Sequence, residues 1–323
     1  MTIDERYAEI AALASDGAED LDWEPTPEDD EDFVLYGLRR GCVGMISGAG
    51  AAGKSFLCLE LAYGCALGKQ LFSFQRPCAK PMKVLFLTCE EDKKDMRRRK
   101  YGVRQTFGDF FKMNMPETRA LLKQNCKIYP IAGKLIQLPE DFALLRKICT
   151  FDGNFSPDLI FLDPLAMLHD CEENDNGQMT KIVQQFTALA QELNAAVVLC
   201  HHLTKDAVCS GSMTQTSSRG ASGINCAVRW EIAIAKKTTK TQKKSGRVLE
   251  VSETELVCRH VKCNGAKVLP DMAFERKDTG AIVDMGVNLN LTGQTLGERL
   301  AVGDASLVET LYIQKKNNII GGC

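Results

Sequence analysis

Eight consecutive residues, Gly48 to Ser55, have the types and spacing that bind phosphate. They read Gly-Ala-Gly-Ala-Ala-Gly-Lys-Ser and fit the pattern G-x-x-x-x-G-K-[ST] without a gap. Glycines in such a loop let backbone N–H groups close around phosphate oxygens, because no Cβ intervenes. Lys54 is expected to contact the β- and γ-phosphates of ATP, and Ser55 to hold Mg²⁺. The alternative is a glycine-rich turn with a chance lysine.

The elements around this loop favour the phosphate-binding interpretation. An apolar run at residues 43–46 precedes the loop, and a helical run at residues 56–67 follows it. A strand, a glycine-rich loop and a helix in this order place the phosphates at a helix N-terminus, which carries partial positive charge. The predicted ATP-binding set in the loop is Gly48, Gly50, Ala51, Ala52, Gly53, Lys54, Ser55 and Phe56.

Acidic residues follow two further apolar runs. Asp163 ends the run at residues 159–162, where P-loop proteins place a carboxylate that holds Mg²⁺. Its alternative role is to cap the following turn. Glu90 and Glu91 follow the run at residues 84–87, and either could orient or deprotonate the attacking water. The other glutamate would then begin a helix over residues 93–100, where acids suit the N-terminal dipole.

A histidine pair and a polar segment follow another apolar run. His201 and His202 come after residues 196–199, so they are expected beside the γ-phosphate, although a structural role for the pair stays open. Two histidines alone do not make a zinc site. Residues 206–218 are small and polar, which predicts a loop, and Arg219 follows. Arg219 is either an ordinary surface arginine or one that reaches a phosphate across a subunit boundary.

The composition excludes some classes of protein. The 323 residues carry a net charge of −2, so any contact with nucleic acid must be local. No stretch approaches the ~20 apolar residues of a membrane span, and no secretory signal is visible. The 14 cysteines form no C-x-x-C pair, and several lie in apolar runs, which favours a reduced, cytoplasmic location.

The order of apolar runs predicts an α/β fold. Short apolar runs separated by helical segments recur along the chain and indicate a mostly parallel twisted sheet flanked by helices. Runs at residues 255–263, 268–275 and 281–285 predict an antiparallel C-terminal extension. The basic stretch 236–247 is expected to be a solvated hairpin tip. The predicted domains are an acidic segment with a short helix at residues 3–13 (1–32), an ATPase domain (33–285) and a tail (286–323).

Together these motifs resemble the RecA-fold ATPases, and specifically the RepA-type hexameric replicative helicases of broad-host-range plasmids. The resemblance spans residues 32–284. The residues that carry it are 32–38, 41–44 and the P-loop; 89–91 with Arg99; 129–133; 162–165 with His169 and 172–174; 201–202 with Lys205; and 218–222 followed by 229–230.

The resemblance implies a role for each matching residue. Glu90 matches the catalytic base, Asp163 the Mg²⁺ ligand, and Arg219 an arginine finger given to the neighbouring subunit. His201 and His202 match residues that sense the γ-phosphate, and Lys262 resembles a lysine near the nucleotide. Residues 170–178 and 206–217 match loops that touch single-stranded DNA in a ring pore. The implied partners are further copies in a homohexamer, single-stranded DNA, an origin-binding initiator and a separate primase.

Three departures from the family pattern leave alternatives open. Ala51 stands where related loops often carry glycine, and a methyl group there requires a negative φ. Glu91 replaces a common aspartate, which leaves open which glutamate is the base. The second pore-loop segment has no Lys or Arg, which favours an ATP switch without motor activity. The main hypothesis is an ATP-driven DNA helicase ring, and the alternative is such a switch in recombination or regulation.

Overall fold

The structure, a computed structural model, describes residues 2–12, 32–75, 80–203, 222–243 and 246–287. The chain divides into two units, Met1–Asp32 and Phe33–Cys323. In the first unit α1 spans Ile3–Ala11, close to the predicted helix. The Thr2 N–H donates to Glu5 Oε2 at 2.6 Å and the Glu5 N–H to Thr2 Oγ1 at 3.2 Å. This reciprocal capping box explains where the helix begins.

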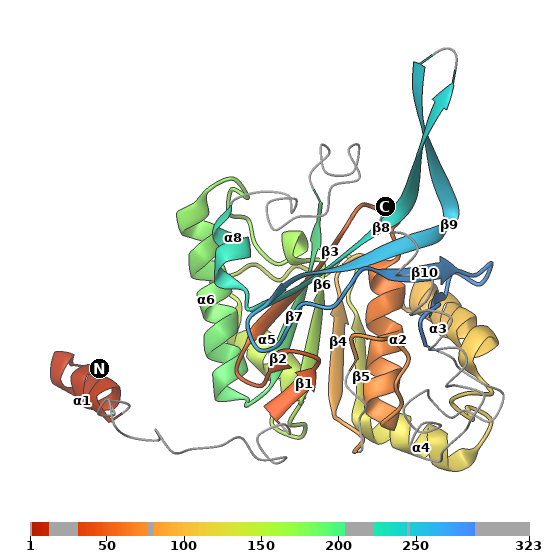
Figure 1. The fold of residues 1–323 in the computed structure, drawn as a ribbon. Helices are drawn as coiled ribbons and strands as arrows, with labels where there is room; N and C mark the ends of the chain where they lie inside the picture. Colours follow the sequence, from red (N-terminus) through yellow and green to blue (C-terminus); the bar gives the residue numbers. More distant parts are fainter. Residues whose placement is uncertain (1, 13–31, 76–79, 204–221, 244–245, 288–323) are drawn as a thin grey trace, which may run out of the picture. The chain divides into compact units, whose positions relative to one another are not determined.

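One large sheet organises the second unit (Figure 1). Among the described residues it has nine strands in the order β11-β10-β9-β8-β3-β7-β6-β4-β5. The six strands from β8 to β5 pair in parallel, and β9, β10 and β11 extend the sheet antiparallel. The strands are β3 (Val43–Gly48), β4 (Val84–Thr88), β5 (Cys126–Pro130), β6 (Leu159–Asp163), β7 (Ala196–His202), β8 (Trp230–Lys243), β9 (Gly246–Cys263), β10 (Met272–Arg276) and β11 (Ile282–Asp284).

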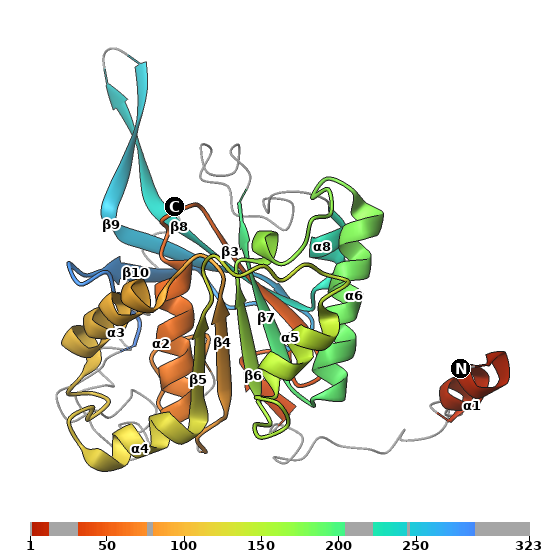
Figure 2. The same cartoon turned by 180° about the vertical axis from the view of Figure 1, so that it is seen from behind.

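Helices cover both faces of this sheet, as Figures 1 and 2 show from opposite sides. On one face α2 (Lys54–Leu67), α3 (Lys93–Phe107) and α4 (Pro116–Asn125) pack against the sheet. On the other lie α5 (Phe142–Cys149), η2 (Leu165–Met167), α6 (Asn176–Glu192) and α8 (Ser222–Ala227). A short hairpin of β1 (Phe33–Leu35) and β2 (Leu38–Arg39) leads into the sheet.

Two hydrophobic cores follow from the alternation of side chains along each strand. Phe86 on β4 and Phe161 on β6 face α2, and their rings lie 6.3 Å apart. Leu85 and Leu87 face the opposite core with α5 and α6. Because both faces are covered there, the central strands β4 and β6 are apolar at every position except the last, rather than at alternate ones. The predicted α/β class with a mostly parallel sheet and an antiparallel C-terminal extension is confirmed.

The antiparallel part differs in detail from the prediction. The stretch 236–247 belongs to a long hairpin in which β8 and β9 pair from Trp230 and Cys263 out to Lys243 and Gly246. The hairpin extends beyond the rest of the sheet (Figure 1). β10 begins at Met272 and not at 268, because Pro270 has no N–H to give to a ladder. Residues 288–323, including the expected tail, lie outside the described residues.

None of the helices in the described part of the chain combines the length and apolar character that crossing a membrane requires.

Candidate active site

The predicted catalytic motifs meet at one edge of the sheet. β3, β7, β6 and β4 are neighbouring parallel strands, so their carboxyl ends lie side by side. Gly48 at the end of β3 is in register with His202 at the end of β7. Thr88 at the end of β4 is in register with Asp163 at the end of β6. Ligands of open α/β sheets bind at this edge, which places the loop, the acids and the histidines around one ligand.

A cavity of about 450 Å³ opens between these strand ends and the start of α2. It collects loop residues, an acid from β6, an acid that follows β4 and one histidine. Three further residues come from α3 and from the antiparallel extension. Its lining is Gly50, Ala51, Gly53, Lys54, Ser55, Phe56, Glu90, Arg99, Asp163, His202, Arg276 and Gly280. Gly48 and the buried Ala52 support the loop without lining the cavity.

Lys54 lies folded over its own loop. Its Nζ donates to the carbonyl oxygens of Gly48 at 2.9 Å and Ala49 at 3.1 Å, and lies 3.4 Å from His202 Nδ1. Lys54 is only 7% exposed, and no carboxylate of the described residues forms an ion pair with it. A buried cation without a carboxylate partner among the described residues is well suited to receive phosphate oxygens.

Asp163 and Ser55 fit the requirements of a Mg²⁺ site. The Asp163 carboxyl is almost fully buried, and burial raises its pKa, whereas a hydrogen bond from Ser55 and the charge of Lys54 lower it. Its Oδ2 has no hydrogen-bond partner in the described part of the chain. An orphaned carboxylate oxygen beside a hydroxyl is the oxygen donor set that Mg²⁺ prefers. Mg²⁺ held there would neutralise charge on the phosphates.

The two adjacent glutamates occupy different environments. Glu90 is exposed and lines the cavity. Glu91 is 5% exposed, does not line the cavity, and forms an ion pair with Arg99 of α3. Burial raises the pKa of Glu91, and the Arg99 charge opposes that shift. Only Glu90 has the access to water and ligand that a general base needs. The geometry therefore favours Glu90 for that role, which stays a prediction.

The two adjacent histidines also occupy different environments. His202 lines the cavity, whereas His201 is fully buried and does not. Adjacent residues of a strand point to opposite faces, so only one of the pair can face the ligand. The structure thus brings His202 to the candidate site and leaves His201 in the core of the sheet.

The loop backbone contradicts the expectation for Ala51. Its φ is 57°, in the left-handed region, where the sequence argument required a negative value. This conformation costs a non-glycine residue about 1–2 kcal/mol. The Ala51 carbonyl accepts a hydrogen bond of 2.6 Å from Nη2 of Arg276 in β10. A contact from outside the loop therefore accompanies the strained residue.

Gly53 is required by both its backbone and its surroundings. Its φ is 104°, and a Cβ placed there would lie 2.5 Å from Cδ1 of Ile282 in β11. We therefore expect Gly53→Ala to lower the free energy of unfolding by about 1–3 kcal/mol, since strain and overpacking add. Urea unfolding of the variant and the wild type measures the difference. Gly50→Ala, whose Cβ would meet nothing within 4 Å, is the matched control.

Three residues of the site, Arg99, Arg276 and Gly280, have no role that their sequence positions predict. Arg99 lies 4.8 Å above the Phe56 ring while it pairs with Glu91. Arg276 reaches the loop from β10, and Gly280 lies against the Phe56 ring. Arg99 was noted only as part of a resemblance. Nothing in the spacing of Arg276 and Gly280 marks them, because the sheet alone brings residues about 225 positions apart together.

Of the remaining predicted residues, Lys262 lies away from the cavity. Lys262, in β9, donates to the carbonyl oxygens of Asn225 at 2.7 Å and Cys226 at 3.3 Å in α8. In the β8–β9 ladder, Lys262 is in register with Glu231, near the start of β8. The starts of β8 and β3 lie at the opposite edge of the sheet from the phosphate-binding loop, and Lys262 does not line the cavity. Arg219, together with residues 206–217, lies outside the described residues.

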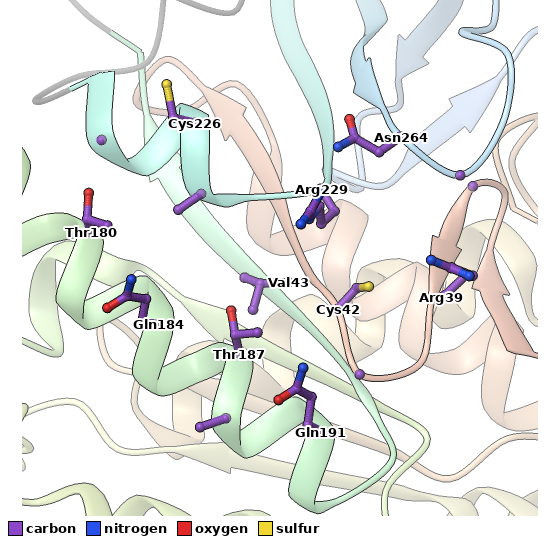
Figure 3. A pocket seen from close by; sticks show the side chains of 16 residues that line it. Arg39, Cys42, Val43, Thr180, Gln184, Thr187, Gln191, Cys226, Arg229 and Asn264 are labelled. Carbon is purple, nitrogen blue, oxygen red and sulfur yellow. The ribbon is translucent and has the colours of Figure 1, made fainter. Parts of the chain in front are cut away.

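A larger cavity of about 770 Å³ lies at that opposite edge (Figure 3). Thr180, Gln184, Thr187 and Gln191 of α6 line one side of it, and Arg39, Arg229 and Asn264 lie across from them. Among the described residues, no aspartate or glutamate lines it. It adjoins Val43 at the start of β3, whereas the phosphate-binding loop follows the end of β3, so it is separate from the candidate ATP site.

A comparison with protein families matches residues 8–208 to the AAA_25 family, which is described as an AAA domain. The match includes β3, the loop, Glu90, Asp163 and both histidines, and covers well over half of the chain. The order of the strands and the position of the loop agree with this assignment. The chain therefore belongs to the AAA_25 family and contains a RecA-like P-loop ATPase domain.

Proposed function

We propose that this protein is an ATP-hydrolysing ring motor, a homohexameric DNA helicase that moves along single-stranded DNA during replication of a plasmid, phage or other mobile element. In this proposal Glu90 takes the proton of the attacking water, and Lys54 stabilises charge on the transferred phosphoryl group. Ser55 and Asp163 hold Mg²⁺. His202 lies beside the γ-phosphate, and Arg219 of a neighbouring copy completes the site.

The observation that carries the motor proposal is the contact between α6 and α8. α6 begins within the first segment that resembles a pore loop, at Asn176 rather than after 178, and α8 follows the second segment. The N–H of Gly223 in α8 donates to Asn176 Oδ1 at 2.7 Å. This hydrogen bond joins a residue of the first segment to α8, which begins five residues after the second segment. In this proposal it links the supports of two loops that share one DNA strand.

The electrostatics of that side support DNA binding. The net charge of the protein is −2, so contact with phosphates needs a local basic surface. Arg39 and Arg229 are exposed in the α6–α8 cavity, and none of the described residues that line it is acidic. These arginines supply positive charge near α8 that residues 206–217 themselves lack.

An unwinding assay on forked DNA tests the motor directly. We expect strand displacement that requires ATP and Mg²⁺, and ATP turnover that rises when single-stranded DNA is added. Native mass measurement with and without ATP and Mg²⁺ should show a hexamer. Turnover that DNA does not change, together with no displacement by the assembled protein, would instead favour the switch. An origin-binding initiator and a separate primase are the partners that a helicase of this kind would need.

A further inference from the structure

The antiparallel extension is fastened to the phosphate-binding loop and to the helix that follows it. Arg276 of β10 donates to the Ala51 carbonyl oxygen at 2.6 Å. The N–H of Ile282, in β11, donates to Oε1 of the fully buried Glu60 in α2 at 2.9 Å. Thr279, in the turn between these strands, lies 2.7 Å from Thr106 of α3 through their hydroxyl oxygens. The β10–β11 hairpin therefore meets the loop at a defined position.

The guanidinium of Arg276 is well placed to act on the loop. It is half-buried and lines the candidate ATP cavity. No carboxylate of the described residues forms an ion pair with it, and the nearby Glu253 is bound by Lys236 at 2.6 Å. Of the other cations in the cavity, Arg99 is paired with Glu91 and Lys54 with carbonyl groups of the loop. The strongest contact that Arg276 makes is therefore with the Ala51 carbonyl.

Ala51 is the residue of the loop that most needs such a contact. A methyl group disfavours its left-handed conformation, and Ala51 is exposed, so no packing holds it there. A hydrogen bond from a charged donor is stronger than one from a neutral donor. If the contact is lost, Ala51 can relax to a negative φ, and the neighbouring N–H groups no longer converge on the phosphates.

We infer that Arg276 is a positioning residue for ATP binding, which holds the phosphate-binding loop in its binding conformation through the Ala51 carbonyl. This inference rests on the ATPase part of the proposed function, and neither the ring nor DNA enters it. Under this inference the antiparallel extension contributes to nucleotide binding through Arg276 of β10. It also explains how an alanine can hold a left-handed conformation in this loop, since the Arg276 contact compensates for the methyl group.

A double-mutant cycle between Arg276→Ala and Ala51→Gly tests this inference. The measurement is the Kd for a fluorescent N-methylanthraniloyl derivative of ADP with Mg²⁺. In the wild-type background Arg276→Ala should raise Kd about tenfold, as expected for the loss of a charged hydrogen bond. In the Ala51→Gly background the same change should raise Kd by only about twofold, because glycine adopts the left-handed conformation without a steric penalty.

The alternative is that Arg276 binds the nucleotide through its own charge. In that case Arg276→Ala would weaken binding equally in both backgrounds, and Arg276→Lys would restore most of it. Equal losses would overturn the inference. Under our inference Ala51→Gly restores nucleotide binding to the Arg276→Ala variant. Arg276→Lys restores it poorly, because lysine lacks the planar guanidinium group of arginine. In turnover assays, KM for ATP should rise while kcat stays nearly unchanged.

Two controls keep the cycle interpretable. Lys277→Ala removes a charge one residue further on, from a side chain paired with Glu275 at 2.7 Å, and should leave Kd unchanged. Thermal unfolding without nucleotide identifies a variant that fails to fold, and Arg276→Gln then replaces Arg276→Ala in the cycle. A wild-type protein that binds no nucleotide would contradict the ATPase assignment, whereas equal losses in the cycle contradict only the role of Arg276.

Discussion

Glu90→Gln is expected to abolish ATP turnover while ATP binding stays close to that of the wild type. The amide preserves the shape of the side chain but cannot take a proton from water, and general-base catalysis contributes about 10²–10⁴-fold to a rate. Glu90 is exposed at the cavity, so removal of its charge leaves no buried partner unsatisfied. Turnover at saturating ATP, measured beside the Kd for a nucleotide analogue, gives both quantities.

Glu91→Gln is the matched comparison, because it makes the same chemical change one residue away. Glu91 is buried and pairs with Arg99, so its neutralisation leaves a half-buried guanidinium without its counter-charge. The expected result is a loss of stability of about 1–3 kcal/mol, with turnover reduced much less than by Glu90→Gln. If Glu91→Gln alone produces a protein that binds but does not hydrolyse ATP, the base is Glu91.

The large features of this fold are predictable because burial on both faces shapes the composition of each strand. Residues 159–162 and 196–199 are uninterrupted apolar runs, and they form β6, which ends one residue later than expected, and β7, which continues to His202 and includes both histidines. An acid or a histidine at the end of such a run must then lie at the ligand-binding edge. The P-loop, Asp163 and one of the two glutamates could therefore be placed in one site from sequence alone.

The choice within each pair needed the structure. From sequence spacing, Glu90 and Glu91 are equally good candidates for the catalytic base. In the same way, His201 and His202 are equally good candidates for the residue beside the γ-phosphate. Which member faces the ligand depends on the twist and register of the strand end. The side chain of Glu91 points to Arg99, and that of His201 into the core, while Glu90 and His202 line the cavity. Local sequence carries no signal for such an orientation.

Ala51 and Arg276 show a second limit of sequence reasoning. A rule about one residue, that alanine avoids a positive φ, predicted the wrong backbone for Ala51. The left-handed conformation costs alanine free energy but is not forbidden, so a favourable contact from elsewhere in the protein can offset that cost. That contact comes from β10, 225 positions along the chain. It becomes visible only when the antiparallel extension is folded against the loop.

Arg219→Ala is expected to bind ATP almost normally and to hydrolyse it very slowly. An arginine finger stabilises charge that develops in the transition state and contributes roughly 10³–10⁵-fold to the rate in well-studied ATPases and GTPases. In the described part of the cavity, the two arginines are held by Glu91 and by the Ala51 carbonyl. Neither is free to replace a finger without breaking its own contact, so the loss from Arg219→Ala should be large.

Mixing two inactive variants decides whether the finger acts between subunits. Arg219→Ala subunits keep an intact phosphate-binding loop, whereas Lys54→Ala subunits cannot stabilise the β- and γ-phosphates but keep their arginine. In a mixed assembly, an Arg219→Ala site can receive the arginine of a Lys54→Ala neighbour, so part of the ATPase activity should return. Activity should reach its maximum at intermediate mixing ratios, because only unlike neighbours form a complete site.

Native mass measurement on the same mixtures shows whether the two variants assemble together. Mixed assemblies without any recovery would contradict a finger in trans, and a finger that acts within its own chain would become the simpler explanation. Recovered activity that single-stranded DNA does not stimulate would support the ring but not the motor. Recovered activity that DNA stimulates would support both the ring and the motor. The site that hydrolyses ATP would then lie at a subunit interface, where its chemistry can move one subunit relative to the next.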